Sequence, residues 1–187
     1  MDIIPNFEIG LFNAWIFMIW TIISPFISFR ILNDKKISKK ISYSVKIKHE
    51  KILNILSMSA IIFGFIYSIF LPILFDKIFF LIGLFFFIIG FIFDITAMIY
   101  ISKIEYDKPF IGGPYRYSRH PLYLSLILII IGIFLMTLSW LYLLIMLICI
   151  IHILIVVPYE EKYCLEKYGK KYFDYMNKTH RWFGLPK

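Results

Sequence analysis

The amino-acid sequence predicts an all-α integral membrane protein of about five transmembrane helices, with a short helical tail after the last one. Hydrophobic residues make up 60% of the 187 positions and charged residues only 17%, whereas a soluble domain has close to half apolar and about a quarter charged residues. The apolar residues also come in runs long enough to cross a bilayer, which is the more specific sign of a membrane protein.

Five apolar segments reach the length that a transmembrane helix needs, roughly 20 residues. They are about Ile9–Leu32, Ile52–Phe75, Ile78–Ile101, Leu122–Leu138 and Leu141–Val157. Only Ser139 and Trp140 separate the last two, and the combined run is too long for one crossing. We therefore expect a tight helical hairpin at this point.

The basic residues predict the orientation. Every Lys and Arg except Lys77 lies at Arg30, between the first two segments, between the third and fourth, or after the fifth. Five crossings place all of these on one side, which the positive-inside rule makes cytoplasmic. We expect the N-terminus outside and the C-terminus in the cytoplasm. The net charge of +8 then follows from membrane topology, and no nucleic-acid partner is expected.

The cysteine and histidine pattern argues against two other classes of protein, disulfide-stabilised domains and metal-binding proteins. Cys149 lies inside an apolar run and Cys164 in the charged tail, so a disulfide framework is not expected. The chain also lacks the Cys and His spacing that is typical of a metal site, and we predict none.

Two cytoplasmic stretches are unusually rich in polar and aromatic residues. They cover residues 110–123, which enter the fourth segment, and residues 158–186, which leave the fifth. Since a short hairpin joins those two segments, their cytoplasmic ends should be neighbours. The two stretches are therefore expected to build one site.

The first stretch offers a turn and positive charge. Gly112, Gly113 and Pro114 are typical of a turn where backbone approaches a ligand closely. Pro121 suits the first position of a helix, whose free N–H groups favour a carboxylate or phosphate. The positive charges come from Arg116 and Arg119.

The second stretch offers negative charge directly after a membrane segment. Glu160 and Glu161 can bind an amine or ribose hydroxyls. Together with the arginines they would suit a zwitterionic ligand. Alternatively, the arginines and tyrosines are interface anchors and the glutamates pair with nearby lysines. We favour a functional site because these residues gather in one short region.

The two stretches carry a family pattern. The run from Gly112 to Tyr123, Gly-Gly-Pro-Tyr-Arg-Tyr-Ser-Arg-His-Pro-Leu-Tyr, resembles the Gly-x-Tyr-x-x-x-Arg-His-Pro-x-Tyr signature of the isoprenylcysteine carboxyl methyltransferase family. The run from Glu160 to Phe183 is similar to that family's C-terminal Glu-Glu…Tyr…Arg motif.

The resemblance implies a membrane methyltransferase with S-adenosylmethionine as methyl donor. By position, the residues that match the family's cofactor contacts are Tyr115, His120, Pro121, Leu122, Tyr123 and Glu160, and we add Glu161. Arg119 and Arg116 are the candidates for orienting the acceptor or the cofactor carboxylate. An apolar acceptor would enter from the bilayer and the cofactor from the cytosol.

The sequence departs from the family pattern at the acceptor position. Members that methylate prenylcysteine carry an Arg four residues before the first glutamate, where this chain has Val156. This departure argues against a prenylcysteine substrate, and the acceptor stays open between an isoprenylcysteine carboxylate and another lipid, amine or thiol.

Two polar residues lie within the apolar segments. Asp94 is near the middle of the third, and an acid within the membrane is a functional candidate by default. We expect it to lie away from the cytoplasmic site. Alternatively, it pairs with a polar group such as His152 or Thr96. His152 itself is more typical of a structural hydrogen bond.

Taken together, residues 1–187 are interpreted as a single membrane domain, with residues 102–187 as its catalytic and cofactor-binding half. Two alternatives stay open. Membrane sterol reductases that use NADPH end in a similar pattern, although they are much longer. A non-enzymatic membrane protein would use the charged loop and tail to bind lipid or partners.

Overall fold

The structure is a computed structural model that describes residues 10, 12–34, 50–104 and 108–186. Helices dominate this part of the chain, where β-structure is limited to an isolated bridge between Asn13 and Pro72. The elements are α1 Trp15–Asp34, α3 Glu50–Ile69, α4 Ile78–Lys103, the 3-10 turn η1 Gly113–Arg116, α5 Pro121–Thr137, α6 Trp140–Tyr168 and α7 Lys170–Lys178. The predicted all-α membrane class is confirmed.

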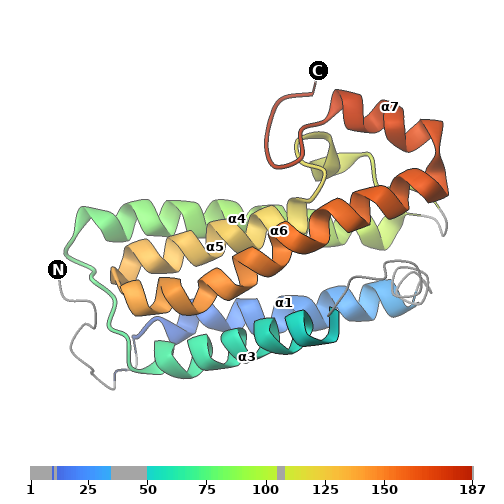
Figure 1. Ribbon diagram of the computed structural model, residues 1–187. Coiled ribbons are helices and arrows are strands. Elements are labelled where there is room, and N and C mark those ends of the chain that lie inside the picture. The colour runs from blue at the N-terminus through green and yellow to red at the C-terminus, as the bar shows by residue number, and fades with distance from the viewer. Residues whose placement is uncertain (1–9, 11, 35–49, 105–107, 187) are drawn as a thin grey trace.

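The long helices lie side by side, and α7 with the C-terminal segment packs across one end of the bundle (Figure 1). Among the described residues, three helices are long and apolar enough to cross a membrane: Lys51–Ile69, Ile78–Lys103 and Trp140–Tyr168. Trp15–Ile31 and Pro121–Thr137 are apolar but shorter. The 17 residues of α5 reach roughly 26 Å at the helical rise of about 1.5 Å per residue, slightly less than the ~30 Å of a bilayer's apolar core.

The first two helices are shorter than the apolar segments that predicted them. Within the described residues, the segment before Trp15 is not helical, because Ala14 N–H donates to Leu71 O at 3.0 Å and Asn13 Nδ2 donates to Ile69 O at 2.7 Å. These bonds tie it to the chain after α3. That helix ends at Ile69 and not at Phe75, since Pro72 disfavours helix in the residue before it. Residues 1–9 and 11 lie outside the described part.

The predicted hairpin between the last two segments is confirmed. Helix α5 ends at Thr137, and the next residue, Leu138, adopts a left-handed conformation with φ 50°. Ser139 then caps α6, since its hydroxyl accepts a hydrogen bond from Tyr142 N–H at 3.3 Å. Two residues therefore reverse the chain between α5 and α6.

Helices α4 and α5 approach each other closely at glycines. A Cβ atom on Gly83 would lie 2.5 Å from Gly132 O, and one on Gly90 would lie 2.8 Å from Ser125 O. Only glycine allows backbones this close. The contact fixes the position of α5, whose first residues belong to the predicted site.

The last long helix continues past its apolar part. Residues 140–157 are almost entirely apolar, whereas the helix goes on through Pro158 and two glutamates to Tyr168. We treat residues 140–157 as the membrane-spanning part. The polar extension carries Glu160 and Glu161 beside the start of α5.

Candidate functional site

The two predicted stretches meet at one end of the bundle. Tyr123 Oη donates a 2.7 Å hydrogen bond to Glu160 Oε1. Glu161 Oε1 lies 3.3 Å from His120 Nε2. The residues before and within the first turn of α5 therefore contact the polar extension of α6, as the topology predicted.

His120 lies between the two carboxylates. Its Nδ1 is 3.6 Å from Glu160 Oε2, and its Nε2 faces Glu161. The ring also stacks on Tyr123, with centroids 5.9 Å apart and an angle of 22° between the planes. Because the imidazole is buried and contacted on both edges, it is held in one position.

Glu161 is the centre of a buried ion-pair network. Arg181 binds it with two hydrogen bonds, from Nε to Oε1 at 3.1 Å and from Nη2 to Oε2 at 2.6 Å. Arg119 Nε lies 2.9 Å from Oε1, but this buried N–H is not aligned with an acceptor in the described chain, so the contact is an ion pair. Burial alone would raise the pKa of Glu161, yet hydrogen bonds from His120 and Arg181 and the charge of Arg119 lower it to about 2.

Glu160 has the opposite character. Burial raises its pKa above the ordinary 4.5, and the hydrogen bond from Tyr123 and the nearby His120 offset this only in part. Its side chain keeps 28% of its surface exposed, and Oε2 makes no hydrogen bond within the described residues. Glu160 is therefore the more accessible of the two carboxylates, and its Oε2 has only the 3.6 Å contact with His120 Nδ1.

The turn before α5 is held by tyrosines and by the C-terminal segment. Tyr115 is buried against Tyr100 and Phe110, with ring centroids 5.7 and 5.5 Å away. Its carbonyl accepts a 2.7 Å hydrogen bond from Tyr175 of α7. Gly113 has φ +55°, a conformation that favours glycine. The predicted turn is therefore present, and α7 supports it.

The start of α5 has no side-chain cap. Pro121 is its first residue, and the His120 side chain makes no capping hydrogen bond. The first N–H groups of a helix have no partner within the helix, so those of Leu122 and Tyr123 remain available for an anionic group. The carboxylate site expected here from the sequence stays a prediction.

The two arginine candidates differ. Besides its contact with Glu161, the Arg119 side chain donates a hydrogen bond from Nη1 to Met176 O at 3.1 Å. The backbone N–H of Arg119 donates to His180 O at 3.0 Å. It ties the C-terminal segment to the site. Arg116 is exposed and makes no hydrogen bond or ion pair with the described residues. The structure therefore brings Arg119 into the cluster and leaves Arg116 outside.

Asp94 has other partners than those predicted. Its Oδ2 accepts hydrogen bonds from Trp20 Nε1 at 2.9 Å and Ser24 Oγ at 2.6 Å, and Ser125 Oγ lies 3.1 Å from Oδ1. The expected pairing with His152 or Thr96 is wrong: His152 Nδ1 lies 2.6 Å from Ser57 Oγ. The hydroxyl of Thr96 bonds to carbonyl groups of its own helix. His152 thus has the structural contact that its sequence context indicated.

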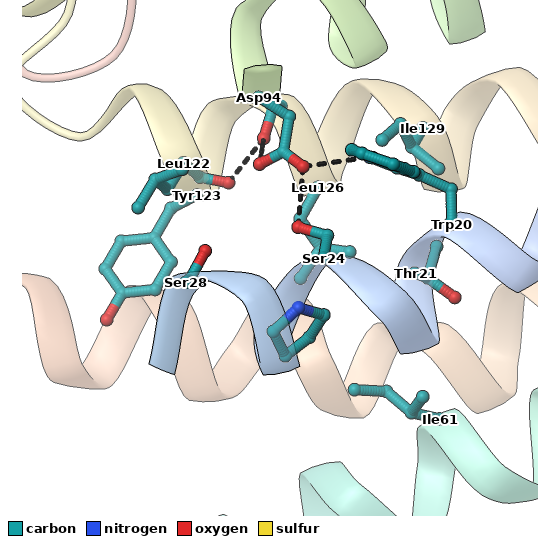
Figure 2. Close-up of a pocket in the computed structure, with 12 residues that line it drawn as sticks. Trp20, Thr21, Ser24, Ser28, Ile61, Asp94, Leu122, Tyr123, Leu126 and Ile129 are labelled. Carbon is teal, nitrogen blue, oxygen red and sulfur yellow. Dashed lines mark hydrogen bonds between the residues drawn. The ribbon is translucent and has the colours of Figure 1, made fainter. Parts of the chain in front are cut away.

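Asp94 is also not remote from the predicted site. It lines a cavity of about 180 Å³ between α1, α4 and α5, and Leu122 and Tyr123 line the same cavity (Figure 2). Sequence reasoning missed this because it treated Asp94 alone. Trp20, Ser24 and Ser28 recur every four residues, and this helical spacing was the available signal for a polar face on α1.

Fold and site together define a polytopic helical membrane protein with an ionic and aromatic site where two helix ends meet. The chain belongs to the phospholipid methyltransferase family, whose profile matches residues 60–171. This family includes the isoprenylcysteine carboxyl methyltransferase-like membrane enzymes, so the resemblance is confirmed. It makes the chain a membrane methyltransferase of a family that generally uses S-adenosylmethionine.

The matched region contains both motifs as far as Lys171, while Arg181 lies beyond it. No curated protein matches this chain.

Proposed function

We propose that this protein transfers the methyl group of S-adenosylmethionine to a lipophilic acceptor at the cytoplasmic face of the membrane. The hydrogen bond between Tyr123 and Glu160 carries the proposal. It joins the two motifs to which the family resemblance assigns the cofactor, and it leaves Glu160 Oε2 without a hydrogen bond within the described residues.

The residues present fit the polar groups of this cofactor. Glu160 offers a partly exposed carboxylate oxygen to an amino group or to ribose hydroxyls. The uncapped start of α5 offers the N–H groups of Leu122 and Tyr123 to a carboxylate. Positive and negative ends of the ligand would thus meet groups of opposite charge. When bound, the cofactor supplies an electrophilic methyl group on a positively charged sulfur.

The remaining site residues act by holding these groups in place. His120 and Tyr123 fix Glu160, whereas Glu161 is occupied by Arg119, His120 and Arg181. An acceptor that is already a nucleophile needs no general base. The protein then contributes alignment and exclusion of water, and positioning alone can supply several kcal/mol.

The acceptor in this proposal is an isoprenylcysteine carboxylate or another lipid with an amine or thiol. It would reach the site from the bilayer, because apolar helices surround the start of α5. The basic residues that precede α5 and follow α6 support the cytoplasmic placement in this proposal.

Equilibrium binding of S-adenosylhomocysteine to the purified full-length protein in detergent tests the proposal. Glu160→Gln should weaken binding about tenfold, since it removes a charge-assisted hydrogen bond. Glu166→Gln is the matched control, because that glutamate lies on the same helix with 65% of its side chain exposed and should bind as the wild type does.

The alternatives give different results in the same assay. Binding of NADPH without a response to S-adenosylhomocysteine would indicate a reductase. Binding of neither ligand would indicate a non-enzymatic protein. Equal affinity of the wild type and Glu160→Gln would show that the cofactor lies elsewhere.

A further inference from the structure

The C-terminal segment, residues 179–186, folds back from α7 onto the bundle (Figure 1). Backbone hydrogen bonds hold it against the turn before α5. The N–H of Arg119 donates to His180 O at 3.0 Å, and the N–H of Gly184 donates to Tyr117 O at 2.9 Å. Gly184 also lies so close to the His180 ring that a Cβ atom at this position would clash with it. The segment therefore has a defined position against the bundle.

The segment meets α4 within the length of that helix that spans the membrane. The rings of Phe183 and Phe93 pack edge to face, with centroids 6.1 Å apart. Phe93 lies ten positions before Lys103, the last residue of α4, so the contact is roughly 15 Å from this end of the helix. The helix is about 9 Å longer than the ~30 Å apolar core of a bilayer. Even if all of this excess protruded at the Lys103 end, the contact would still lie inside the apolar core.

Two apolar side chains of the segment are largely uncovered by the described residues. Phe183 is 63% exposed and Leu185 is 76% exposed. On α4, Ile92 is exposed as well, so the surface that Phe183 extends is the apolar outer face of a membrane-spanning helix. Exposed apolar surface of this kind marks contact with a membrane or a protein. Because it continues the outer face of α4, the acyl chains of the bilayer are the partner that fits.

Basic side chains next to the segment suit lipid head groups. Lys178 directly precedes the segment, and Arg116 is the neighbour of Tyr117, whose carbonyl binds Gly184. Both basic side chains are exposed. Lys and Arg near a membrane surface are attracted to anionic head groups, and their long side chains can extend to reach them. Apolar residues for the membrane interior thus lie close to cations for its surface.

The segment is also bound to the candidate site. Arg181 makes two hydrogen bonds to Glu161, and its carbonyl accepts a 3.3 Å hydrogen bond from Ser118 Oγ. The next residue, Trp182, has its ring centroid 6.5 Å from that of His120. A shift of the segment would therefore remove the partner of Glu161.

We propose that the C-terminal segment is inserted in the leaflet beside the candidate site, with Phe183 and Leu185 among the acyl chains, and that this lipid contact keeps Arg181 on Glu161. Transfer of apolar side chains from water into an apolar environment is favourable, and Arg181 lies directly before the inserted residues. The inference does not depend on the reaction that the site performs, because it rests on the position and exposure of the segment.

Spin-label accessibility in phosphatidylcholine nanodiscs tests the insertion. In the full-length chain with Cys149→Ala and Cys164→Ala, a nitroxide is attached at Leu185→Cys. Its collisions with oxygen, which concentrates in the bilayer, are compared with its collisions with a water-soluble nickel chelate. The label should favour oxygen, as a label at Ile92→Cys should. Glu166→Cys is the aqueous control, because that side chain is 65% exposed on the polar extension of α6. A Leu185 label with the accessibility of the Glu166 label would overturn the proposal.

A photo-cross-linker gives a second measurement that keeps both cysteines. Benzoylphenylalanine in place of Leu185, in the otherwise unchanged chain, should form an adduct with phosphatidylcholine on irradiation in nanodiscs. Mass spectrometry detects this adduct as the added mass of one lipid. The same group in place of Glu166 should give no adduct. Equal yields at the two positions would contradict the insertion, even if the chain without cysteines does not fold.

Trypsin cleavage after Arg181 in nanodiscs tests the link between lipid contact and the ion pair. Leu185→Ser removes apolar surface at a largely exposed position, so Arg181 should leave Glu161 more often and be cut at least about threefold faster than in the wild type. Leu185→Ile is the matched control, because it keeps the apolar surface, and it should be cut at the wild-type rate. If Leu185→Ser is cut no faster than the wild type, lipid contact does not hold Arg181 in place.

Discussion

Tyr123 and Glu160 lie on different helices, 37 positions apart, and the phenol donates a 2.7 Å hydrogen bond to the carboxylate. This contact is possible because α5 and α6 form a hairpin. The start of α5 and the polar extension of α6 therefore lie at the same end of the bundle. It brings both motifs of the family into one site, and it also connects that site to the cavity beside Asp94.

Replacing Tyr123 by Phe should change the pH dependence of cofactor binding. The phenol lowers the pKa of Glu160, which burial otherwise raises above 4.5. Without it the pKa rises further, so Glu160 becomes protonated at a higher pH and loses its charge for a ligand amine. The pH midpoint for loss of S-adenosylhomocysteine binding should therefore shift upward. A downward shift would mean that Glu160 is not the titrating group.

Replacing Arg181 by Ala should release the C-terminal segment. Arg181 makes two hydrogen bonds to Glu161, and bonds to charged groups contribute about 1.5–3 kcal/mol each in buried settings. Since Arg181 is 44% exposed, the low end of this range is expected. Limited proteolysis should cut the variant faster after α7. Arg116→Ala, at an exposed site without a described contact, should be cut at the wild-type rate.

Acid should loosen the same segment. The pKa of Glu161 is lowered from 4.5 to about 2, so its ion pairs stabilise the fold fully above about pH 4.5 and lose this effect as the pH falls toward 2. Hydrogen exchange at Gly184, whose N–H bonds to Tyr117 O at 2.9 Å, should lose protection in this window after correction for intrinsic rates. Glu161→Gln should be less protected at neutral pH and show no such transition.

Replacing Gly83 by Leu should destabilise the bundle. Any Cβ there would lie 2.5 Å from Gly132 O and 2.7 Å from Met136 Cγ, so α4 and α5 would have to separate. Overpacking of this kind typically costs about 1–3 kcal/mol, and thermal unfolding in detergent should occur at a lower temperature. Ile88→Leu on the same helix changes an exposed side chain and should leave the unfolding temperature unchanged.

Cysteine labelling should place the two ends of the bundle on opposite sides of the membrane. In a chain without Cys149 and Cys164, a cysteine at Lys178 is expected to react only after the membrane is permeabilised. One at Lys77 is expected to react in intact cells. The reverse pattern would contradict the orientation predicted from the basic residues.

The approximate positions of the long helices could be predicted from the apolar runs, because a helix that spans a membrane needs about 20 apolar residues. The ends were less predictable. The segment before Trp15 and the chain after Ile69 are apolar enough for a helix, but they form hydrogen bonds with each other across the structure, and such long-range pairing leaves no local pattern.

The sequence predicted which helix ends meet at the site. It did not predict which partner each charged side chain there binds. Adjacent helix ends bring Tyr123 to Glu160. The sequence does not reveal that Arg181 and Arg119 bind Glu161 while the side chain of Glu160 stays partly exposed. The partners of Asp94 come from α1 and α5, and the four-residue spacing of Trp20 and Ser24 indicated only those on α1.

The contact between Gly83 and Gly132 has a consequence for where the helix bundle can open. Backbone against backbone leaves no side chain that could swing aside, so α4 and α5 move as one body. Helix α1 meets them through side chains such as Trp20 against Phe91 and Ser24 against Asp94, which can part and re-form. Opening of the cavity beside Asp94 is therefore expected at α1 and not between α4 and α5, and a cross-link between α1 and α4 should keep it closed.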